Sequence, residues 1–292
     1  GPVEILVVDS ASSPPVRIGE ARVRVVREDQ PGLSRARRRA VLESTGALCA
    51  FVDDDNLLDW DYLELAVSFF AEHPGVGAAG GKIEAEFAES LPEWTAEFLP
   101  LLAIRDCGAE QLIGDRKAEA AFPEFAPVGA GMVIRRTALE SWLQESSPGL
   151  QDRYGSTLSS AGDSEMMLRV WSEGWQLAYL PRLKLTHLLA AARLEVGYLG
   201  RLNRSIQRDW VRVLRLFGIC PWPRIAWWSF PVRIARAWFR RAAWRGGAGW
   251  IRWQGDYGRF EGCLESGSID SVSRALRGWA AGKGLGKLLY RV

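Results

Sequence analysis

The chain has 292 residues, of which 48% are hydrophobic and 25% are charged, so its composition excludes an intrinsically disordered protein. Its length allows one large core, or one core with an appendage. The net charge of +2 conceals an uneven distribution, because residues 201–292 hold 18 of the 37 Lys and Arg but only 5 of the 35 Asp and Glu. The remaining 19 basic and 30 acidic residues lie in residues 1–200, so an acidic body precedes a basic tail.

Apolar runs and helical patterns alternate along the first 190 residues. Strands are predicted at residues 5–8, 23–26, 48–52, 76–83, 129–134 and 176–180, the last followed past Pro181 by the segment 183–187. Helices are predicted at residues 35–44, 60–73, 137–145 and 163–173, and residues 84–127 are expected to be irregular, with a mobile loop. Because strands alternate with helices, we expect an α/β fold with a mostly parallel, Rossmann-like sheet that binds ligands at the carboxyl ends of its strands.

Three consecutive aspartates, Asp53, Asp54 and Asp55, follow the predicted strand at residues 48–52 and precede Asn56. Several carboxylates at the end of a buried strand make an oxygen-rich site that suits Mg²⁺ or Mn²⁺ and, through the cation, phosphate. Like charges this close repel one another unless a cation or hydrogen bonds compensate. An Asp-rich turn or a helix N-cap is the alternative interpretation.

Six short segments share an order and spacing that are more specific than any one of them: VVDSAS (7–12), PGLSRARRRAV (31–41), FVDDDN (51–56), GAGMVIRR (129–136), GDSEMMLRVWSEGW (162–175) and LKLTH (183–187). Together they resemble the family 2 glycosyltransferases with the GT-A fold, in particular bacterial, exopolysaccharide-type members. The resemblance implies inverting transfer of a hexosyl group from a nucleotide-diphosphate donor to a hydroxyl acceptor, with Mn²⁺ or Mg²⁺ as cofactor.

The resemblance also implies roles for the residues that meet the donor. Asp55, together with Asp53 and His187, would hold the metal, although a single histidine is more commonly a structural residue. Asp53 and Asp54 would contact the donor's ribose or assist the metal, and Asp9 would read the nucleobase. Arg37 matches an arginine near the base and diphosphate.

The catalytic base would be Asp163, which matches the acidic residue at the start of that helix in the family. A base that deprotonates the acceptor hydroxyl contributes about 10²–10⁴-fold in rate. The usual Glu-Asp pair is Gly162-Asp163 here, and Glu165 is the second candidate. A carboxylate that merely caps the helix is the alternative role for Asp163.

On the acceptor side the resemblance points to the segment that contains Gly129, Ala130 and Gly131. Trp175 could stack on a sugar, although its spacing from Trp171 also fits two core residues on one helix. Family members carry a further strand and helix before the segment that corresponds to residues 7–12. Either the sequence is truncated or part of the donor site has been lost, and the second alternative would favour a catalytically inactive scaffold.

The basic tail combines arginine with tryptophan. Residues 201–260 contain 13 Arg and no Lys, and eight of the 14 Trp lie between Trp210 and Trp253. This combination suits an anionic membrane surface, for which the candidate contacts are Arg208, Arg212, Trp227, Trp228 and Trp238. A basic face that packs on the acidic body is the alternative, and single-stranded nucleic acid is not expected as a partner.

We therefore expect a GT-A catalytic domain at residues 1–190 and a helical, membrane-associating extension at residues 191–292. The four Cys lack metal-ligand spacing, and no apolar run is long enough to cross a bilayer, which favours a cytoplasmic protein peripheral to the inner face of the cell membrane. The acceptor would be a glycan or a polyprenyl- or other lipid-linked sugar in polysaccharide or glycolipid synthesis. A metal-dependent phosphoryl-transfer enzyme is the rival interpretation.

Overall fold

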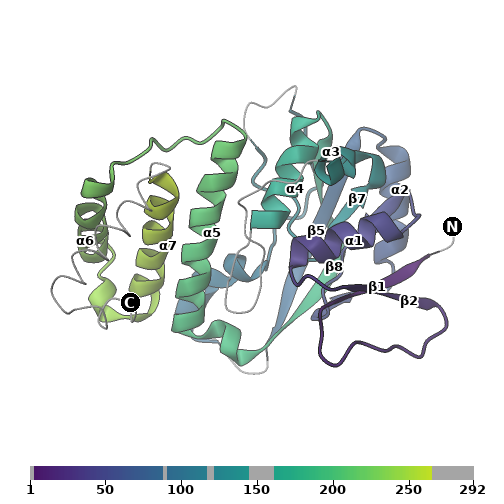
Figure 1. Ribbon diagram of the computed structural model, residues 1–292, viewed down its shortest axis with the longest axis horizontal. Helices are drawn as coiled ribbons and strands as arrows, with labels where there is room; N and C mark the ends of the chain where they lie inside the picture. Colours follow the sequence, from purple (N-terminus) through teal and green to yellow (C-terminus); the bar gives the residue numbers. More distant parts are fainter. Residues whose placement is uncertain (1–2, 88–90, 117–121, 145–160, 265–292) are drawn as a thin grey trace. The chain divides into compact units, whose positions relative to one another are not determined.

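The computed structural model describes residues 3–87, 91–116, 122–144 and 161–264 (Figure 1). The chain divides into two compact units, Gly1–Leu202 and Asn203–Val292. The first unit contains all the strands of the described residues, and the second is helical.

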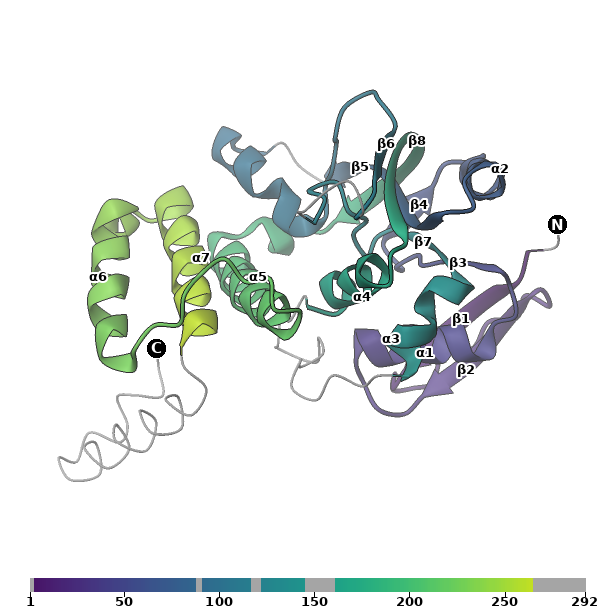
Figure 2. The same cartoon turned by 90° about the horizontal axis from the view of Figure 1, so that it is seen from above.

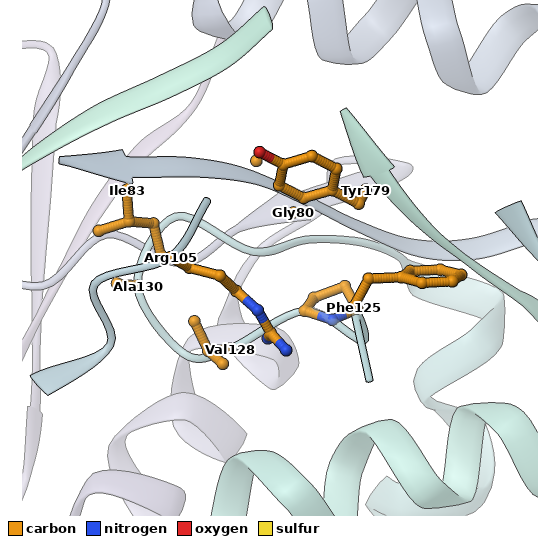
Figure 3. Close-up of a pocket in the computed structure, with 9 residues that line it drawn as sticks. Gly80, Ile83, Arg105, Phe125, Val128, Ala130 and Tyr179 are labelled. Carbon is orange, nitrogen blue, oxygen red and sulfur yellow. The ribbon is translucent and has the colours of Figure 1, made fainter. Parts of the chain in front are cut away.

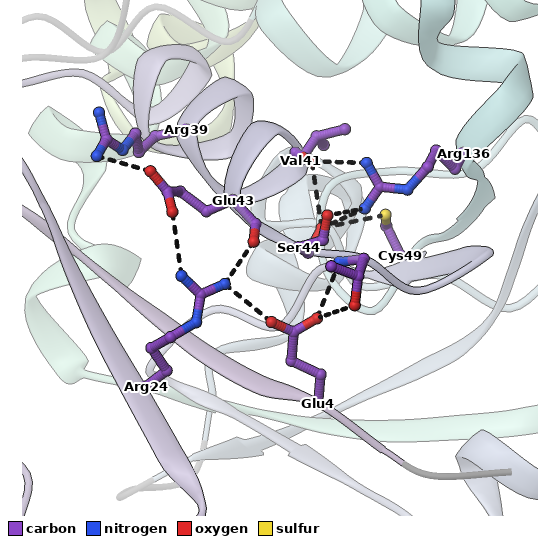
Figure 4. Close-up of polar contacts among 9 residues, drawn as sticks. Glu4, Arg24, Arg39, Val41, Glu43, Ser44, Cys49 and Arg136 are labelled. Carbon is purple, nitrogen blue, oxygen red and sulfur yellow. Dashed lines mark hydrogen bonds and ion pairs between the residues drawn. The ribbon is translucent and has the colours of Figure 1, made fainter.

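The first unit begins with two parallel strands, β1 (Ile5–Ser10) and β2 (Val23–Glu28), whose register pairs the first residue of each. Both were predicted. Arg24 of β2 pairs with Glu43 at 3.0 Å and with Glu4 at 2.8 Å (Figure 4). Glu4 also accepts a hydrogen bond from the amide of Thr45 at 2.9 Å. These contacts tie the two strands to the end of the following helix.

That helix, α1 (Leu33–Glu43), confirms the helix predicted at residues 35–44. Its last carbonyls need partners outside the helix. Arg136 supplies them, because its guanidinium donates to the carbonyls of Val41 at 2.7 Å and Ser44 at 2.6 Å (Figure 4). A cation at this end also complements the helix dipole. Arg136 thereby fixes the helix that carries Arg37 to the segment around residue 136.

The main sheet of the described residues has six strands in the order β3–β7–β5–β8–β4, with β6 paired to β8. Their bounds are β3 (Leu48–Ala50), β4 (Asn56–Leu58), β5 (Val76–Phe87), β6 (Leu112–Gly114), β7 (Val133–Arg135) and β8 (Gln176–Leu189). Only β5 and β8 pair in parallel in this sheet, while the other four pairings are antiparallel. The α/β class is confirmed, but the expectation of a mostly parallel sheet is wrong: the sheet is mixed.

Strand β8 runs without a break through Pro181, where two separate segments were expected. The register against β5 jumps from Gly81↔Leu180 to Lys82↔Lys184, so Pro181 lies in a bulge that interrupts the ladder. Gly81 permits the bulge, because a Cβ there would overlap the carbonyl oxygen of Leu183. The bulge lets one strand reach from the core to the candidate site.

Helices cover both faces of the main sheet (Figure 2). One face packs on α1, α3 (Glu140–Gln144) and α4 (Ala161–Ser172), and the other packs on α2 (Tyr62–Glu72). Neighbouring residues of a strand point to opposite faces, so Ile134 joins the first core and Val133 the second. The predicted helices at 60–73 and 163–173 are confirmed.

The segment at residues 84–127 is more regular than expected within its described part. β5 extends to Phe87, a 3₁₀ helix η1 spans Glu93–Leu102, and β6 follows. The loop predicted in this segment falls partly on residues 88–90 and 117–121, which lie outside the described residues. Two further 3₁₀ turns, η2 (Arg136–Leu139) and η3 (Ala191–Leu194), complete the first unit.

The helical unit contains most of α5 (Val196–Leu216), then η4 (Trp227–Ser229), α6 (Phe230–Arg240), η5 (Ala243–Arg245) and α7 (Gly247–Cys263). Glycines let α5 and α7 approach closely, since a Cβ at Gly258 would overlap the carbonyl oxygen of Arg204. Arg204 also pairs with Glu261 at 2.6 Å. No helix among the described residues has the length and apolar character required to cross a membrane.

Candidate active site

The three aspartates lie in the connection between β3 and β4. The amide of Asn56 donates to the carbonyl of Asp53 at 3.0 Å, which closes a turn, and the buried Asn56 side chain donates to Asp55 Oδ1 at 3.0 Å. The carbonyl of Asp55 accepts the amide of Leu188 on β8 at 2.8 Å. Asp54 is exposed. The aspartates therefore differ: Asp55 is oriented by two elements, and Asp54 faces solvent.

Strand pairing brings His187 to Asp55. The antiparallel register of β4 and β8 places Asn56 opposite His187, and His187 Nε2 lies 3.3 Å from Asp55 Oδ2. The buried ring is fixed by its other nitrogen, since Nδ1 lies 3.0 Å from the carbonyl oxygen of Leu102. A carbonyl oxygen only accepts hydrogen bonds, so Nδ1 carries a hydrogen and Nε2 is the nitrogen that faces Asp55.

Arg193 joins this pair, and the sequence did not single it out. Its Nη1 lies 2.9 Å from Asp55 Oδ2 and 3.4 Å from His187 Nε2. Arg193 comes from η3, six positions after His187, in an otherwise apolar segment. The only signal in the sequence is a lone cation just after the segment LKLTH, which is too weak to identify it.

Asp55 and His187 fit a divalent cation in part. A ligating histidine usually donates its second ring N–H to a carbonyl or carboxylate, as His187 does to Leu102. Mg²⁺ commonly takes one or two protein ligands and completes its shell with water and phosphate oxygens. No group of three or more His, Cys, Asp or Glu in the described part of the chain could hold a metal. Asp55 and His187 therefore offer two of the ligands that such a cation would need.

Arg37 connects the aspartates to the candidate base. Its buried side chain extends from α1 over the ring of Phe51 and forms an ion pair with Asp163 in the first turn of α4. Arg37 Nη2 lies 3.7 Å from Asp53 Oδ1. Two carboxylates that are 110 positions apart in the sequence thus share one guanidinium. The sequence analysis predicted a site role for each of these three residues, but it did not predict that they contact one another.

Gly129 lies directly against this ion pair. A Cβ at Gly129 would overlap Asp163 Oδ2 and lie 2.5 Å from Arg37 Nη2. Gly162, beside Asp163, is equally crowded, because a Cβ there would overlap Ser34 Oγ of α1. Small residues at both positions let α1, α4 and the segment before β7 converge on the Asp163 carboxylate.

The other residues predicted on the acceptor side are Ala130, Gly131 and Trp175. Ala130 is buried, and Gly131 has a φ of 72°, which favours glycine. The hydroxyl of Tyr62 donates to the carbonyl of Gly131 at 2.5 Å. Burial raises the pKa of Tyr62, which keeps the phenol protonated and able to donate. Trp175 is partly buried against the core that includes α4.

Glu165, the second candidate base, is buried and pairs with Arg169 of the same helix at 3.1 Å. Its carboxylate is therefore held along α4. Asp163 is more accessible, with 25% of its side chain exposed. Of the two, Asp163 is the carboxylate that an acceptor could reach more readily.

Asp9, at the end of β1, is buried and accepts hydrogen bonds from the amides of Ser12 at 3.0 Å and Val16 at 3.2 Å. Arg27 of β2 pairs with it at 2.7 Å. Hydrogen bonds from Ser12, together with the charge of Arg27, lower the pKa of Asp9 to about 2. The carboxylate shapes the loop after β1, where the sequence placed the nucleobase contact.

Arg105 is a further residue that the sequence did not single out. Its side chain extends toward Phe125 and Val128 in the loop before Gly129 (Figure 3). It donates to the carbonyl of Ala126 at 2.5 Å. It also lines a hollow together with Phe125 and Tyr179, and this hollow encloses no space large enough for a water molecule. The contact with Ala126 therefore gives Arg105 a structural role, which is to hold the loop before Gly129.

The predicted membrane contacts occupy two kinds of position. Trp227 and Trp228 are exposed by 53% and 69%. Trp238 instead packs edge-to-face on Trp253, with ring centroids 4.8 Å apart. Arg208 and Arg212 pair with the buried Asp209 at 2.9 and 3.5 Å.

Comparison with models of known protein families found a match to the first 143 residues. Residues 1–143 match the model of "Glycosyl transferase family 2". No curated protein sequence matches the chain.

The solved structures that are similar to the chain include two with TM-scores of 0.42 and 0.41. A crystal structure of GalNAc-T7 with UDP, GalNAc and Mn²⁺ has a TM-score of 0.42 and 14% identity, over 86% of this chain and 46% of that one. The chain thus spans just under half the length of GalNAc-T7. A crystal structure of S. aureus TarS 1-349 has a TM-score of 0.41 and 13% identity, over 88% of this chain and 80% of that one.

The family match agrees with the mixed sheet flanked by helices, so the α/β fold is GT-A-like. Residues 1–143 include the DDDN turn, Arg37 and Gly129, whereas Asp163 and His187 lie beyond the matched region. The first half of the chain is therefore similar in sequence to family 2 glycosyltransferases, which supports transfer of a glycosyl group from a nucleotide sugar.

Proposed function

We propose that the chain transfers a sugar from a nucleotide-diphosphate donor to an acceptor hydroxyl, with inversion at the anomeric carbon. The observation that carries this proposal is the shared guanidinium of Arg37, which contacts both Asp53 and Asp163. Inverting transfer needs a base on one side of the sugar and charge stabilisation for the leaving diphosphate on the other. Arg37 contacts one carboxylate from each of the two acidic elements that would take these roles.

Asp163 takes the proton from the acceptor hydroxyl in this proposal. A base must be ionised to act, and Arg37 neutralises the charge of that form while its guanidinium cannot itself give up a proton. Gly129 leaves no room for a side chain between the pair and the acceptor segment. The substrate hydroxyl would approach along the loop that Arg105 and Tyr62 position.

Asp55 and His187 would hold Mn²⁺ or Mg²⁺, with Asp53 close by. When bound, such a cation offsets the negative charge that develops on the departing diphosphate. Asp9 would lie at the nucleobase end, where its hydrogen bonds fix the loop after β1.

Substitution of the base tests this proposal. Asp163→Asn should lower kcat by about 10²–10⁴-fold while leaving donor affinity within a few fold. The assay screens nucleotide sugars with Mn²⁺ and acceptor glycans, detects the new glycosidic bond by mass spectrometry, and measures donor affinity by calorimetry. Full turnover in Asp163→Asn would show that the base lies elsewhere. Release of phosphate without a glycosidic bond would favour a phosphoryl-transfer enzyme instead.

The helical unit would bind an anionic membrane surface and present the catalytic unit to a lipid-linked acceptor on the inner face of the cell membrane. Support comes from the outer face of α6, where Val232 and Phe239 are exposed by 58% and 69%. Arg233, Arg236 and Arg240 are exposed beside them. Apolar side chains bordered by cations are typical of helices that lie in a membrane interface.

Trp227 and Trp228 provide the test for this second part. Replacing both with Ala should release most of the protein from vesicles that contain anionic lipid, and raised salt should weaken binding of the unchanged protein. Trp60, which is 91% exposed in the first unit, gives the matched control as Trp60→Ala. Equal sedimentation of all three proteins with anionic vesicles would contradict membrane binding through Trp227 and Trp228.

A further inference from the structure

Arg193 places a positive charge beside Asp55 in the DDDN turn, and the family resemblance does not imply this charge. Arg193 Nη1 lies within 2.9 Å of Asp55 Oδ2 and 3.4 Å of His187 Nε2, and these two atoms are 3.3 Å apart. The guanidinium therefore faces the same two atoms that a cation would use. Both ligands and Arg193 belong to the first unit.

We propose that Arg193 is an internal counter-cation that competes with the divalent metal for Asp55 and His187. The metal binds only when the guanidinium leaves. This inference rests on the metal use of the proposed function, and it adds a control that the residues of the family motif do not contain.

The charges make simultaneous binding unfavourable. A divalent cation on Asp55 and His187 would lie within a few ångströms of a guanidinium that cannot lose its proton. Without the metal, the same guanidinium offsets the repulsion of the neighbouring carboxylates. One site thus alternates between two cations.

Arg193 has a route out of the site. Its side chain is 36% exposed, and the two preceding alanines, Ala191 and Ala192, are also exposed. The short turn η3 offers little packing that would resist a rotation of the arginine into solvent. An anionic diphosphate would draw the guanidinium away from Asp55, so the metal and a nucleoside diphosphate should each strengthen the binding of the other.

Mn²⁺ binding to the full chain tests the inference without any assay of turnover. Electron paramagnetic resonance measures free Mn²⁺ in titrations of the unchanged protein, Arg193→Met and Arg182→Met. Arg182 is exposed on the same strand as His187 and controls for loss of one positive charge. Arg193→Met should bind Mn²⁺ about 10-fold more tightly or better, within the range of about 5–150-fold that is usual for coupled sites. Arg182→Met should bind as the unchanged protein does.

UDP and a second variant complete the test. UDP should tighten Mn²⁺ binding in the unchanged protein by a larger factor than in Arg193→Met, and Asp55→Asn/Arg193→Met should lose the gain. Equal Mn²⁺ affinity in Arg193→Met and the unchanged protein would overturn the inference, as would an equal gain in Arg182→Met or no Mn²⁺ binding at all. A glycosidic product in the screen above would still support the proposed function in each of these cases.

Discussion

Gly129→Ala perturbs the ion pair between Arg37 and Asp163 without removing either charge. The new Cβ would lie 2.5 Å from Arg37 Nη2, whereas ordinary contacts begin at 3.4 Å, so the guanidinium or the loop must move by nearly 1 Å. The Cβ would also overlap Asp163 Oδ2, which forces the carboxylate away from its present position.

A misplacement of this size in a reacting group can cost about 100-fold in rate. We therefore expect kcat/KM to fall by about 100-fold, which corresponds to about 2.7 kcal/mol of transition-state stabilisation. The overlap should also destabilise the fold by about 1–3 kcal/mol, as an added methyl group does in a packed interior. The chain should remain folded.

The assay measures initial rates with saturating acceptor and varied nucleotide sugar, alongside thermal unfolding. Gly19→Ala is the matched control, because no atom lies within 4 Å of the position of its new Cβ. Gly19→Ala should keep the activity of the unchanged protein. If Gly129→Ala also keeps it, the ion pair is not at the reacting centre and our reasoning about Asp163 is refuted.

Two further variants test the supports of the site. Tyr62→Phe removes the donor to the buried carbonyl of Gly131 and should cost about 1–3 kcal/mol in the free energy of unfolding, measured in urea. Tyr179→Phe should cost less, because its hydroxyl lies 3.5 Å from Asp106 Oδ1 and from the carbonyl oxygen of Gly108. Equal losses in the two variants would contradict the role given to Tyr62. Asp9→Asn should be less stable than the unchanged protein at pH 7. Because the pKa of Asp9 is lowered from 3.8 to about 2, its ionised form stabilises the fold above pH 4, and the difference should shrink as the pH falls toward 2. A difference that does not change with pH would mean that Asp9 stabilises by packing alone.

Much of the first unit could be predicted because its elements follow simple patterns. The apolar runs at residues 5–8 and 76–83 and the helices before Gly46 and Pro74 carry clear periodicity and stop signals. β4 was missed because three residues are too few to show a pattern. The prediction of a mostly parallel sheet was wrong because the alternation of strands and helices does not determine which strands pair, or in which direction.

In the candidate site, too, local patterns could be predicted and long-range contacts could not. The motif residues were found because carboxylates and histidine stand out after apolar runs, as Asp55 and His187 do. Their meeting depends on the register of β4 with β8, which no local pattern encodes. Arg193 and Arg105 make contacts 138 and 21 positions away. The sequence around them carries at most a weak signal, which for Arg193 is a lone cation six positions after His187.

Residues 191–292 were predicted to be helical, but no bounds were predicted for α7, whose glycines resemble loop signals. Gly255 and Gly258 instead face α5, where any Cβ would collide with Asn203 or with the backbone of Arg204. Close helix packing therefore uses the residues that weaken helix propensity. Packing between helices also explains the position of Trp238 in α6, because its ring contacts Trp253 of α7.

The most direct test of the central claim is a crystal structure of the full chain with UDP and Mn²⁺, using the anomalous signal of manganese. Our account predicts a manganese peak in direct contact with an oxygen of Asp55 and with Nε2 of His187, next to the diphosphate and with Arg193 displaced. Asp163 should remain paired with Arg37 and open to the acceptor. A diphosphate bound away from the DDDN turn, or manganese bound at other residues, would contradict the account.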